Sequence, residues 1–322
     1  MPMPGQQPED QAWKASPTGA EVVRALGVEA EALPPPSPHR FPDGAHFRTE
    51  IPSVEGPEAL AAVVEEAGRR QVVVNRVSQG SGAMLLSRAE LREMARIGAD
   101  QGMEVSLFVG PREEWDLGAS SRGPDGPALA GLVRGARQLR YAFEDVARAA
   151  EQGIRSFLVA DPGLLETLVG AQRRGELPAE IVWKASVYMA PANPVSFAQL
   201  QRLGASTVNV PSDMTLGQLS ELRSVSDLPI DLYVESPDSL GGLVRGHELA
   251  DLVSVAAPLY AKFGLRNARG LYPSGGHLRN DVIAMARERV RRAGIALEWL
   301  ARLSDGLTQS APGAKGLGIP LA

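Results

Sequence analysis

The sequence predicts a (β/α)8 barrel, in which eight parallel strands form a closed cylinder and the connecting helices surround it. The chain has 322 residues, a length that suits one large domain. Between residues 46 and 302, short apolar runs alternate with stretches of helical periodicity, which is typical of a parallel sheet. No glycine-rich dinucleotide-binding turn follows the early strands, which disfavours an open, doubly wound sheet as the alternative.

Two peripheral segments are expected to flank the barrel at residues 46–302. The N-terminal extension, residues 1–45, holds a short helical pattern over 21–26 and then Pro34-Pro35-Pro36, which is typical of stiff, extended chain. Residues 303–322 are rich in glycine and small side chains, and they are predicted to form a flexible tail. The alternative for either segment is that it covers a barrel opening or contacts another subunit.

The strands are predicted from brief apolar runs rich in β-branched residues, the pattern of parallel strands that are buried on both faces. They are expected at residues 47–51, 71–77, 105–109, 154–159, 181–187, 207–210, 230–234 and 252–256.

Helices are predicted where apolar residues recur three and four positions apart. The longest such pattern covers 129–150, and the last helix should open at Asp281 and run to about residue 300. Asp161-Pro162 and Asn193-Pro194 each combine a capping side chain with proline at the first helical position. Further helices are expected at 58–67, 91–97 and 216–222, whereas Gly241-Gly242 weakens the pattern between 238 and 248.

Composition excludes several classes of function. The 33 basic and 38 acidic residues give a net charge of −5, which argues against nucleic acid as the main partner. The absence of cysteine excludes disulfides, thiolate nucleophiles and cysteine-bound iron–sulfur clusters. No run approaches the roughly 20 apolar residues of a membrane helix, and residues 1–10 lack the order of a signal peptide. We therefore expect a cytoplasmic protein with a small-molecule or peptide-like substrate, with a homo-oligomer left open.

Candidate site residues are those near the C-terminal ends of the predicted strands, where barrel enzymes carry their active sites. Both acids and bases occur there, a mixture that suits a polar or anionic small molecule. Those expected to bind substrate are Arg48, Arg76, Ser186, Asn209, Lys262 and Arg266.

Lys184 and Glu235 are the strongest catalytic candidates. Lys184 lies in a strand expected to be buried, and burial lowers the pKa of an amine, which is how Schiff-base lysines arise. The alternative for Lys184 is a structural ion pair with a carboxylate. Glu235 ends a strand without capping a helix, which favours a general base or an ion ligand.

Three further residues complete the predicted site. Glu50 and Asp161, with Glu235, could supply oxygen ligands to a divalent metal ion, although Asp161 also reads as a helix cap. His277 follows the last strand and could act in acid–base catalysis. In the same region Lys262, Arg266 and a Ser-Gly-Gly turn could clamp a phosphate or carboxylate, with an ordinary turn as the alternative.

Residues 154–235 resemble the U32 collagenase-like peptidase family. The motifs that carry the resemblance are 159–165 at a strand-to-helix turn, Ser186, Asn193, Leu203-Gly204, and 207–216 with its polar turn. The resemblance implies a barrel with its site at the strand ends. Family members of known activity resemble iron–sulfur hydroxylases with four cysteines, whereas this chain has none and carries Pro211-Ser212-Asp213 in place of the usual Arg-Glu-Leu. The chain is therefore similar to a cysteine-free, divergent member.

The resulting hypothesis is a U32-like barrel enzyme that acts, by hydrolysis or a related reaction, on an anionic small molecule or peptide-like substrate. Two alternatives remain. One is a lyase or aldolase that forms a Schiff base through Lys184. The other is a non-catalytic barrel that binds a ligand.

Overall fold

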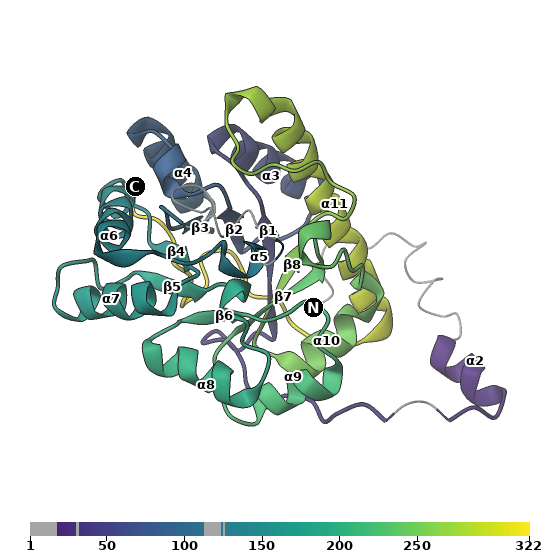
Figure 1. The fold of residues 1–322 in the computed structure, drawn as a ribbon. Coiled ribbons are helices and arrows are strands. Elements are labelled where there is room, and N and C mark those ends of the chain that lie inside the picture. The colour runs from purple at the N-terminus through teal and green to yellow at the C-terminus, as the bar shows by residue number, and fades with distance from the viewer. Residues whose placement is uncertain (1–17, 30–31, 113–123, 125) are drawn as a thin grey trace.

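The chain forms a closed barrel of eight parallel strands with helices around it (Figure 1). The computed structural model describes residues 18–29, 32–112, 124 and 126–322. Every strand pairs with the next one along the chain, and β8 pairs with β1, which closes the cylinder. The strands are β1 Phe47–Pro52, β2 Arg76–Gln79, β3 Glu104–Phe108, β4 Ser156–Val159, β5 Val182–Ala185, β6 Thr207–Asn209, β7 Ile230–Glu235 and β8 Leu259–Phe263. The predicted barrel is thus confirmed.

The helices lie on the outside of this cylinder (Figure 1). They are α2 Gly19–Ala25, α3 Pro57–Arg70, α4 Arg88–Asp100, α5 Gly126–Leu129, α6 Gly135–Glu151, α7 Pro162–Arg173, α8 Pro194–Leu203, α9 Leu216–Arg223, α10 Leu249–Ala256 and α11 Arg279–Leu303. The caps anticipated from the sequence are present, because Asp161 accepts a hydrogen bond from the Leu164 amide and Asn193 accepts one from Ser196. In the described part of the chain, no helix combines the length and apolar character of a membrane span.

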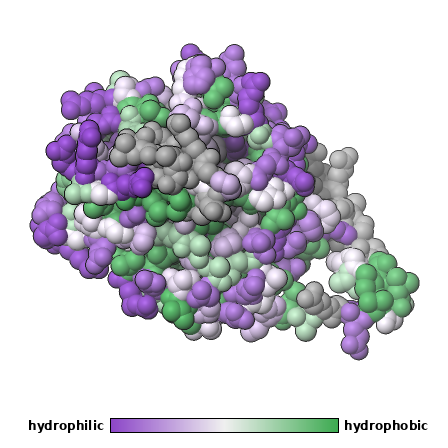
Figure 2. Space-filling model, in the orientation of Figure 1, coloured by the Kyte–Doolittle hydropathy of each residue, from purple (hydrophilic) through white to green (hydrophobic). Residues whose placement is uncertain are grey.

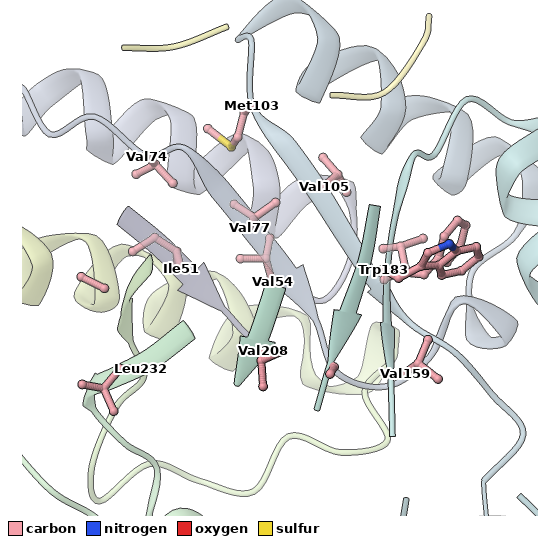
Figure 3. Close-up of a cluster of buried hydrophobic side chains, with 14 of the residues drawn as sticks. Ile51, Val54, Val74, Val77, Met103, Val105, Val159, Trp183, Val208 and Leu232 are labelled. Atoms are coloured by element: carbon pink, nitrogen blue, oxygen red, sulfur yellow. The ribbon is translucent and has the colours of Figure 1, made fainter. Parts of the chain in front are cut away.

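Successive strand residues point to opposite faces of the sheet, and the outward ones form the apolar core. Ile51, Val77, Val105, Val208 and Leu232 are completely buried in this layer between the barrel and the helices (Figure 3). The apolar outward residues give these segments the sequence pattern of buried strands, although the alternate residues, which face the barrel interior, are largely polar.

The eighth strand is a correction to the sequence analysis. Residues 252–256 were expected to form it, but they belong to α10, and β8 follows at Leu259–Phe263. Helix α10 is buried on most sides, so its apolar run lacks the polar stripe that marks a surface helix. Strand β8 carries Tyr260 and Lys262, and because these polar side chains interrupt its apolar run, the segment was interpreted as a loop.

Two element boundaries also differ from the sequence analysis. The helix expected over 129–150 begins later, as α6 at Gly135, and the short α5 ends at Leu129. Gly135 has φ +66°, a left-handed value that does not allow the helix to continue towards the N-terminus. Gly131, in the break, lies so close to Ala160 and Tyr188 that a Cβ there would stand 2.7 Å from the Ala160 side chain. Strand β2 begins at Arg76, later than the expected start at residue 71.

Residues 308–321 cross the barrel at the N-terminal ends of β1 to β4. Ser310 donates its amide to the Phe47 carbonyl, Gly313 donates to Gly102, and Leu321 donates to Gly153. These contacts, spread along the segment, agree with the alternative in which it covers a barrel opening rather than with a flexible tail. The opening concerned is opposite to the one where barrel enzymes carry their active sites.

The N-terminal extension helps to cover the same opening of the barrel. Ser37 bonds through its amide and its hydroxyl to Ser254 and Ala257, at the end of α10. Phe41 is then buried, with its ring 4.1 Å from the Arg48 guanidinium carbon and 5.3 Å from the Tyr260 ring. Helix α2, further towards the N-terminus, has no buried residue and stands away from the barrel (Figure 2). Residues 1–17 of the extension lie outside the described residues.

Asn75 is expected to be essential for this closure. Its buried amide accepts hydrogen bonds from the Thr49 amide and the Gln309 side chain and donates one to the Ser310 carbonyl. Asn75→Ala should lower the free energy of unfolding by about 2–3 kcal/mol, because buried partners lose their hydrogen bonds. Urea denaturation measures this loss. Gln152→Ala, which removes an exposed contact to Arg92, serves as the control and should change little.

Candidate active site

The barrel interior is centred on the carboxylate of Glu50, on β1, which has no contact with solvent. Its Oε1 accepts hydrogen bonds from Lys184 Nζ and from Ser78 Oγ at 2.7 Å, and it lies 3.5 Å from Lys262 Nζ. Its Oε2 lies 3.2 Å from Arg76 Nη1. Burial alone would raise the pKa of Glu50, but the charges of Lys184, Lys262 and Arg76 outweigh it and hold the pKa well below its usual range.

Lys184 projects from β5 and is completely buried. Besides its bond to Glu50, its ammonium lies 3.7 Å from Asp231 Oδ2. Burial lowers the pKa of Lys184 to about 8; Glu50 opposes this shift and the nearby Lys262 charge adds to it. This shift increases the share of the amine that is neutral, and therefore nucleophilic, at a given pH.

Lys262, on β8, shares Glu50 with Lys184 but lies on the side of the C-terminal mouth. Its ammonium hydrogen-bonds Asn209 Oδ1 and sits 4.3 Å from the centre of the Tyr233 ring. Asn209 in turn donates to the Ala185 carbonyl and to Asp231, which holds its amide oxygen towards the lysine. Strands β5, β6, β7 and β8 thus position one connected group of polar side chains.

Arg76 anchors the deeper part of the interior. It lies 2.8 Å from Glu104 and 3.0 Å from Asp231, and its guanidinium stacks 3.4 Å from the Tyr260 ring centre. Glu104 also accepts hydrogen bonds from Ser156 and from the Gly318 amide, which links the cluster to the segment beneath the barrel. We call these connected side chains the charged cluster: Glu50, Arg76, Glu104, Lys184, Asp231 and Lys262.

The charged cluster is balanced in formal charge, with three cations beside three carboxylates, and Arg48 adds a further buried cation at the N-terminal end of the barrel. Within the described part of the chain, Arg76 Nη2 and Ser106 Oγ are buried without a hydrogen-bond partner. Such spare donors suit an anionic ligand or water.

Lysine is rare in this chain, yet two lysines lie inside the barrel. Only four of the 33 basic residues in the sequence are lysine, and two of these four are Lys184 and Lys262. Arginine is the usual partner for a buried carboxylate, because its planar guanidinium binds both oxygens. Lysine differs from arginine in that its amine can become neutral and attack an electrophile.

The structure brings together five of the residues that were singled out from the sequence: Glu50, Arg76, Lys184, Asn209 and Lys262. Ser186 directly follows β5, where its hydroxyl accepts a hydrogen bond from the Tyr188 amide. Its place at the C-terminal end of the strand agrees with the position expected for a substrate-binding residue.

Glu235 lies apart from the charged cluster. A register shift between Tyr233 and Glu235 interrupts the alternation of β7, and the Glu235 side chain is directed towards α11. There it accepts a hydrogen bond from the Arg266 amide and lies 3.7 Å from Arg292. The expected meeting of Glu235 with Lys184 is therefore not observed.

Three other candidates also lie elsewhere. Arg266 is exposed, with its side chain against Gly242, and His277 is exposed before α11. Arg48 lies at the opposite end of the barrel, bonded to Ser310, Tyr260 and the Lys315 carbonyl. The clamp of Lys262 with Arg266 is accordingly not formed.

The expected metal ligands do not converge. Both oxygens of Asp161 accept backbone hydrogen bonds, from Leu164 and Val133, while Glu50 is surrounded by cations. In the described residues, no group of three or more acidic or histidine side chains is arranged to hold a metal ion.

Glu104 and Asp231 were not among the residues predicted from the sequence, although a signal for both exists. Most strands carry polar side chains two positions apart, such as Glu104 with Ser106 and Asp231 with Tyr233. Residues two apart face the same side of a strand. Polar pairs on strands that are otherwise apolar therefore predict a polar barrel interior.

A loop and a cavity lie at the C-terminal mouth. The loop after β8 reaches over the ends of β1 and β2, where Tyr272 bonds Ser53 and packs on Gly80, and the Ser274 amide donates to Ser81. Between the ends of β5, β6 and β7 lies a cavity of about 370 Å³, which is lined by residues that include Tyr233. Tyr233 therefore adjoins both this cavity and Lys262.

Comparisons with known proteins extend to the fold only. No family model and no curated protein matches the chain. Similar solved structures include the putative copper homeostasis protein CutC from Streptococcus agalactiae, with 13% identity, 67% of this chain and 97% of that chain covered, and a TM-score of 0.46. A U32 peptidase has 15% identity, coverage of 65% and 72%, and a TM-score of 0.38. A structure described as native KDPGal has 12% identity, coverage of 80% and 98%, and a TM-score of 0.45.

Removing the central carboxylate should destabilise the protein. Glu50→Gln leaves two buried ammonium groups without their shared counter-charge, and we expect a loss of about 3–5 kcal/mol in the free energy of unfolding. Glu288→Gln removes a surface partner of Arg291 and Arg292 and should cost less than about 1 kcal/mol. Urea denaturation at pH 7 compares the two. If both variants lost a similarly small amount of free energy of unfolding, the ionised side chains of the charged cluster would not stabilise the fold.

Proposed function

We propose that the protein is an enzyme of the lyase or aldolase type, which forms a Schiff base between Lys184 and a small carbonyl compound that carries a negative charge. The observation that carries this proposal is the sharing of Glu50 by two lysine amines inside the barrel. One of these amines has its pKa lowered to about 8 by burial, against the pull of Glu50 and with help from Lys262. Such an arrangement supplies a nucleophile, a proton acceptor and a proton donor in one place.

The side chains support each step of imine formation. The neutral Lys184 amine attacks the carbonyl carbon, and Glu50 takes the proton that the nitrogen releases. Lys262 protonates the carbonyl oxygen to a hydroxyl, and the proton held by Glu50 then passes to this hydroxyl, which leaves as water as the carbon–nitrogen double bond forms. The protonated imine draws electrons from the adjacent carbon–carbon bond and so weakens it.

A spare donor in the interior supports a negatively charged substrate. Arg76 Nη2 is buried without a hydrogen-bond partner, and a low-dielectric surrounding strengthens the attraction of its charge for an anion. A carboxylate or phosphate on the substrate would accept a hydrogen bond from such a donor. Because Lys184 is fully buried, access of such a molecule requires a movement at the C-terminal mouth.

Two other functions were left open by the sequence. Hydrolysis of the U32 type was expected to use Glu235 and His277, and it has less support because Glu235 faces α11 and His277 is exposed. A non-catalytic, ligand-binding barrel would use the same cations without turnover, and the following experiment separates it from the enzyme.

Borohydride trapping tests the proposal directly. The protein incubated with a 2-oxo acid and then reduced should gain the mass of the reduced adduct on Lys184, one of only four lysines in the chain. Lys184→Met should abolish the adduct; it also removes a counter-charge of Glu50 and should lower the melting temperature, so circular dichroism checks that the variant is folded at the temperature of the assay. Binding of 2-oxo acids without any trapped adduct would favour the non-catalytic barrel, and an adduct on another lysine would overturn the assignment of Lys184.

The pH dependence of trapping provides a second test. Because attack requires the neutral amine, the adduct rate should rise about tenfold per pH unit below the Lys184 pKa of about 8 and level off above it. Lys262→Met removes the ammonium that lowers this pKa, so the inflection should move to higher pH by about one unit. Lys262→Arg keeps the charge and should leave the inflection near that of the unaltered protein. An unchanged inflection in Lys262→Met would contradict the coupling.

A further inference from the structure

The cavity at the C-terminal mouth has a mainly apolar wall. Val187 follows β5, Val210 follows β6, and Leu240 and Leu243 lie in the loop after β7. Its volume of about 370 Å³ lies at the lower end of the range for small-molecule sites, roughly 300–1,000 Å³. The cavity therefore fits a group about the size of a branched alkyl chain or a single ring.

Tyr233 connects this cavity to the proposed reacting centre. Its ring lines the cavity and also lies 4.3 Å from Lys262 Nζ. Lys262 and Lys184 both contact Glu50 Oε1. A molecule with its carbonyl carbon at Lys184 and its charged group near Lys262 can thus extend along Tyr233 into the cavity.

The polar groups of the cavity disfavour a second negative charge. The hydroxyl of Ser212 donates to the Leu240 carbonyl and is already engaged. Asp213 places an exposed carboxylate at the rim. Among the residues that line the cavity in the described structure, none is basic, so an anionic group there would meet repulsion and no counter-charge.

We infer that this cavity is the specificity pocket of the enzyme and that it takes an uncharged, apolar substituent of the carbonyl substrate. This inference rests on the proposed function, since it assumes that the reacting carbonyl lies at the lysines. The substrate class is accordingly a short carbonyl compound with one anionic group near the carbonyl and an apolar tail. Burial of such a tail contributes about 0.8 kcal/mol per CH2 group, or roughly fourfold in rate.

A matched series of 2-oxo acids tests the tail preference. Borohydride trapping should proceed at least about tenfold faster with 4-methyl-2-oxopentanoate and phenylpyruvate than with pyruvate, which has no tail to bury. The 2-oxoglutarate chain has a similar length but ends in a second carboxylate, and it should react more slowly than 4-methyl-2-oxopentanoate. Equal rates across the series, or a preference for 2-oxoglutarate, would overturn the inference.

Two neighbouring substitutions show whether the preference arises in this cavity. Leu243→Trp fills the cavity and should remove most of the advantage of the two large substrates over pyruvate. Val244→Trp is the matched control, because Val244 lies in the same loop but lines a different groove, beside α11. It should keep the preference. An unchanged preference in Leu243→Trp, with the melting temperature of the variant retained, would place tail recognition elsewhere.

A binding measurement separates the failure of this inference from the failure of the proposed function. The compound 3-phenylpropanoate carries the tail and the carboxylate but no carbonyl, so its binding requires no covalent step. If no 2-oxo acid is trapped but 3-phenylpropanoate binds and Leu243→Trp abolishes binding in calorimetry, the proposed function fails and the pocket stands. If 3-phenylpropanoate does not bind the unaltered protein, the pocket inference fails whatever the outcome of trapping.

Discussion

A carboxylate removed from water must be compensated by nearby positive charge, and this constraint organises the barrel interior around Glu50. Its cations come from three separate strands: Arg76 from β2, Lys184 from β5 and Lys262 from β8. These strands approach one another across the interior because the sheet closes, with β8 paired to β1. Closure of the barrel and compensation of the Glu50 charge therefore depend on each other. Closure brings the three cations close to Glu50, and their charges offset the free-energy cost of burying it.

The two ends of the barrel have different construction. At the N-terminal ends of the strands, Phe41 and residues 308–321 cover Arg48 and Asn75 with buried hydrogen bonds and ring contacts. At the C-terminal ends, a half-buried Tyr233 lines a cavity and contacts Lys262 of the charged cluster. This difference agrees with the general preference of barrels for chemistry at the C-terminal ends and for stability at the other.

The barrel and half of the candidate site could be predicted from the sequence, and the errors have specific physical causes. Lys184, Lys262 and Glu50 were recognised because strand ends in a barrel converge. Glu235 was misplaced because a register shift after Tyr233 turns its side chain outward, and such bulges leave no mark in the periodicity. The strand expected at 252–256 proved to be α10, since a short apolar run suits a buried helix as well as a strand.

The crossing of residues 308–321 beneath β1 to β4 has a consequence for how the protein matures on the ribosome. Asn75 and Phe47 are synthesised early, yet their partners Ser310 and Gln309 emerge more than 200 residues later. Until then the partners that cover the Arg48 side chain, Ser310 and the Lys315 carbonyl, are absent. The N-terminal end of the barrel therefore cannot be covered in its final form before these last residues have been synthesised.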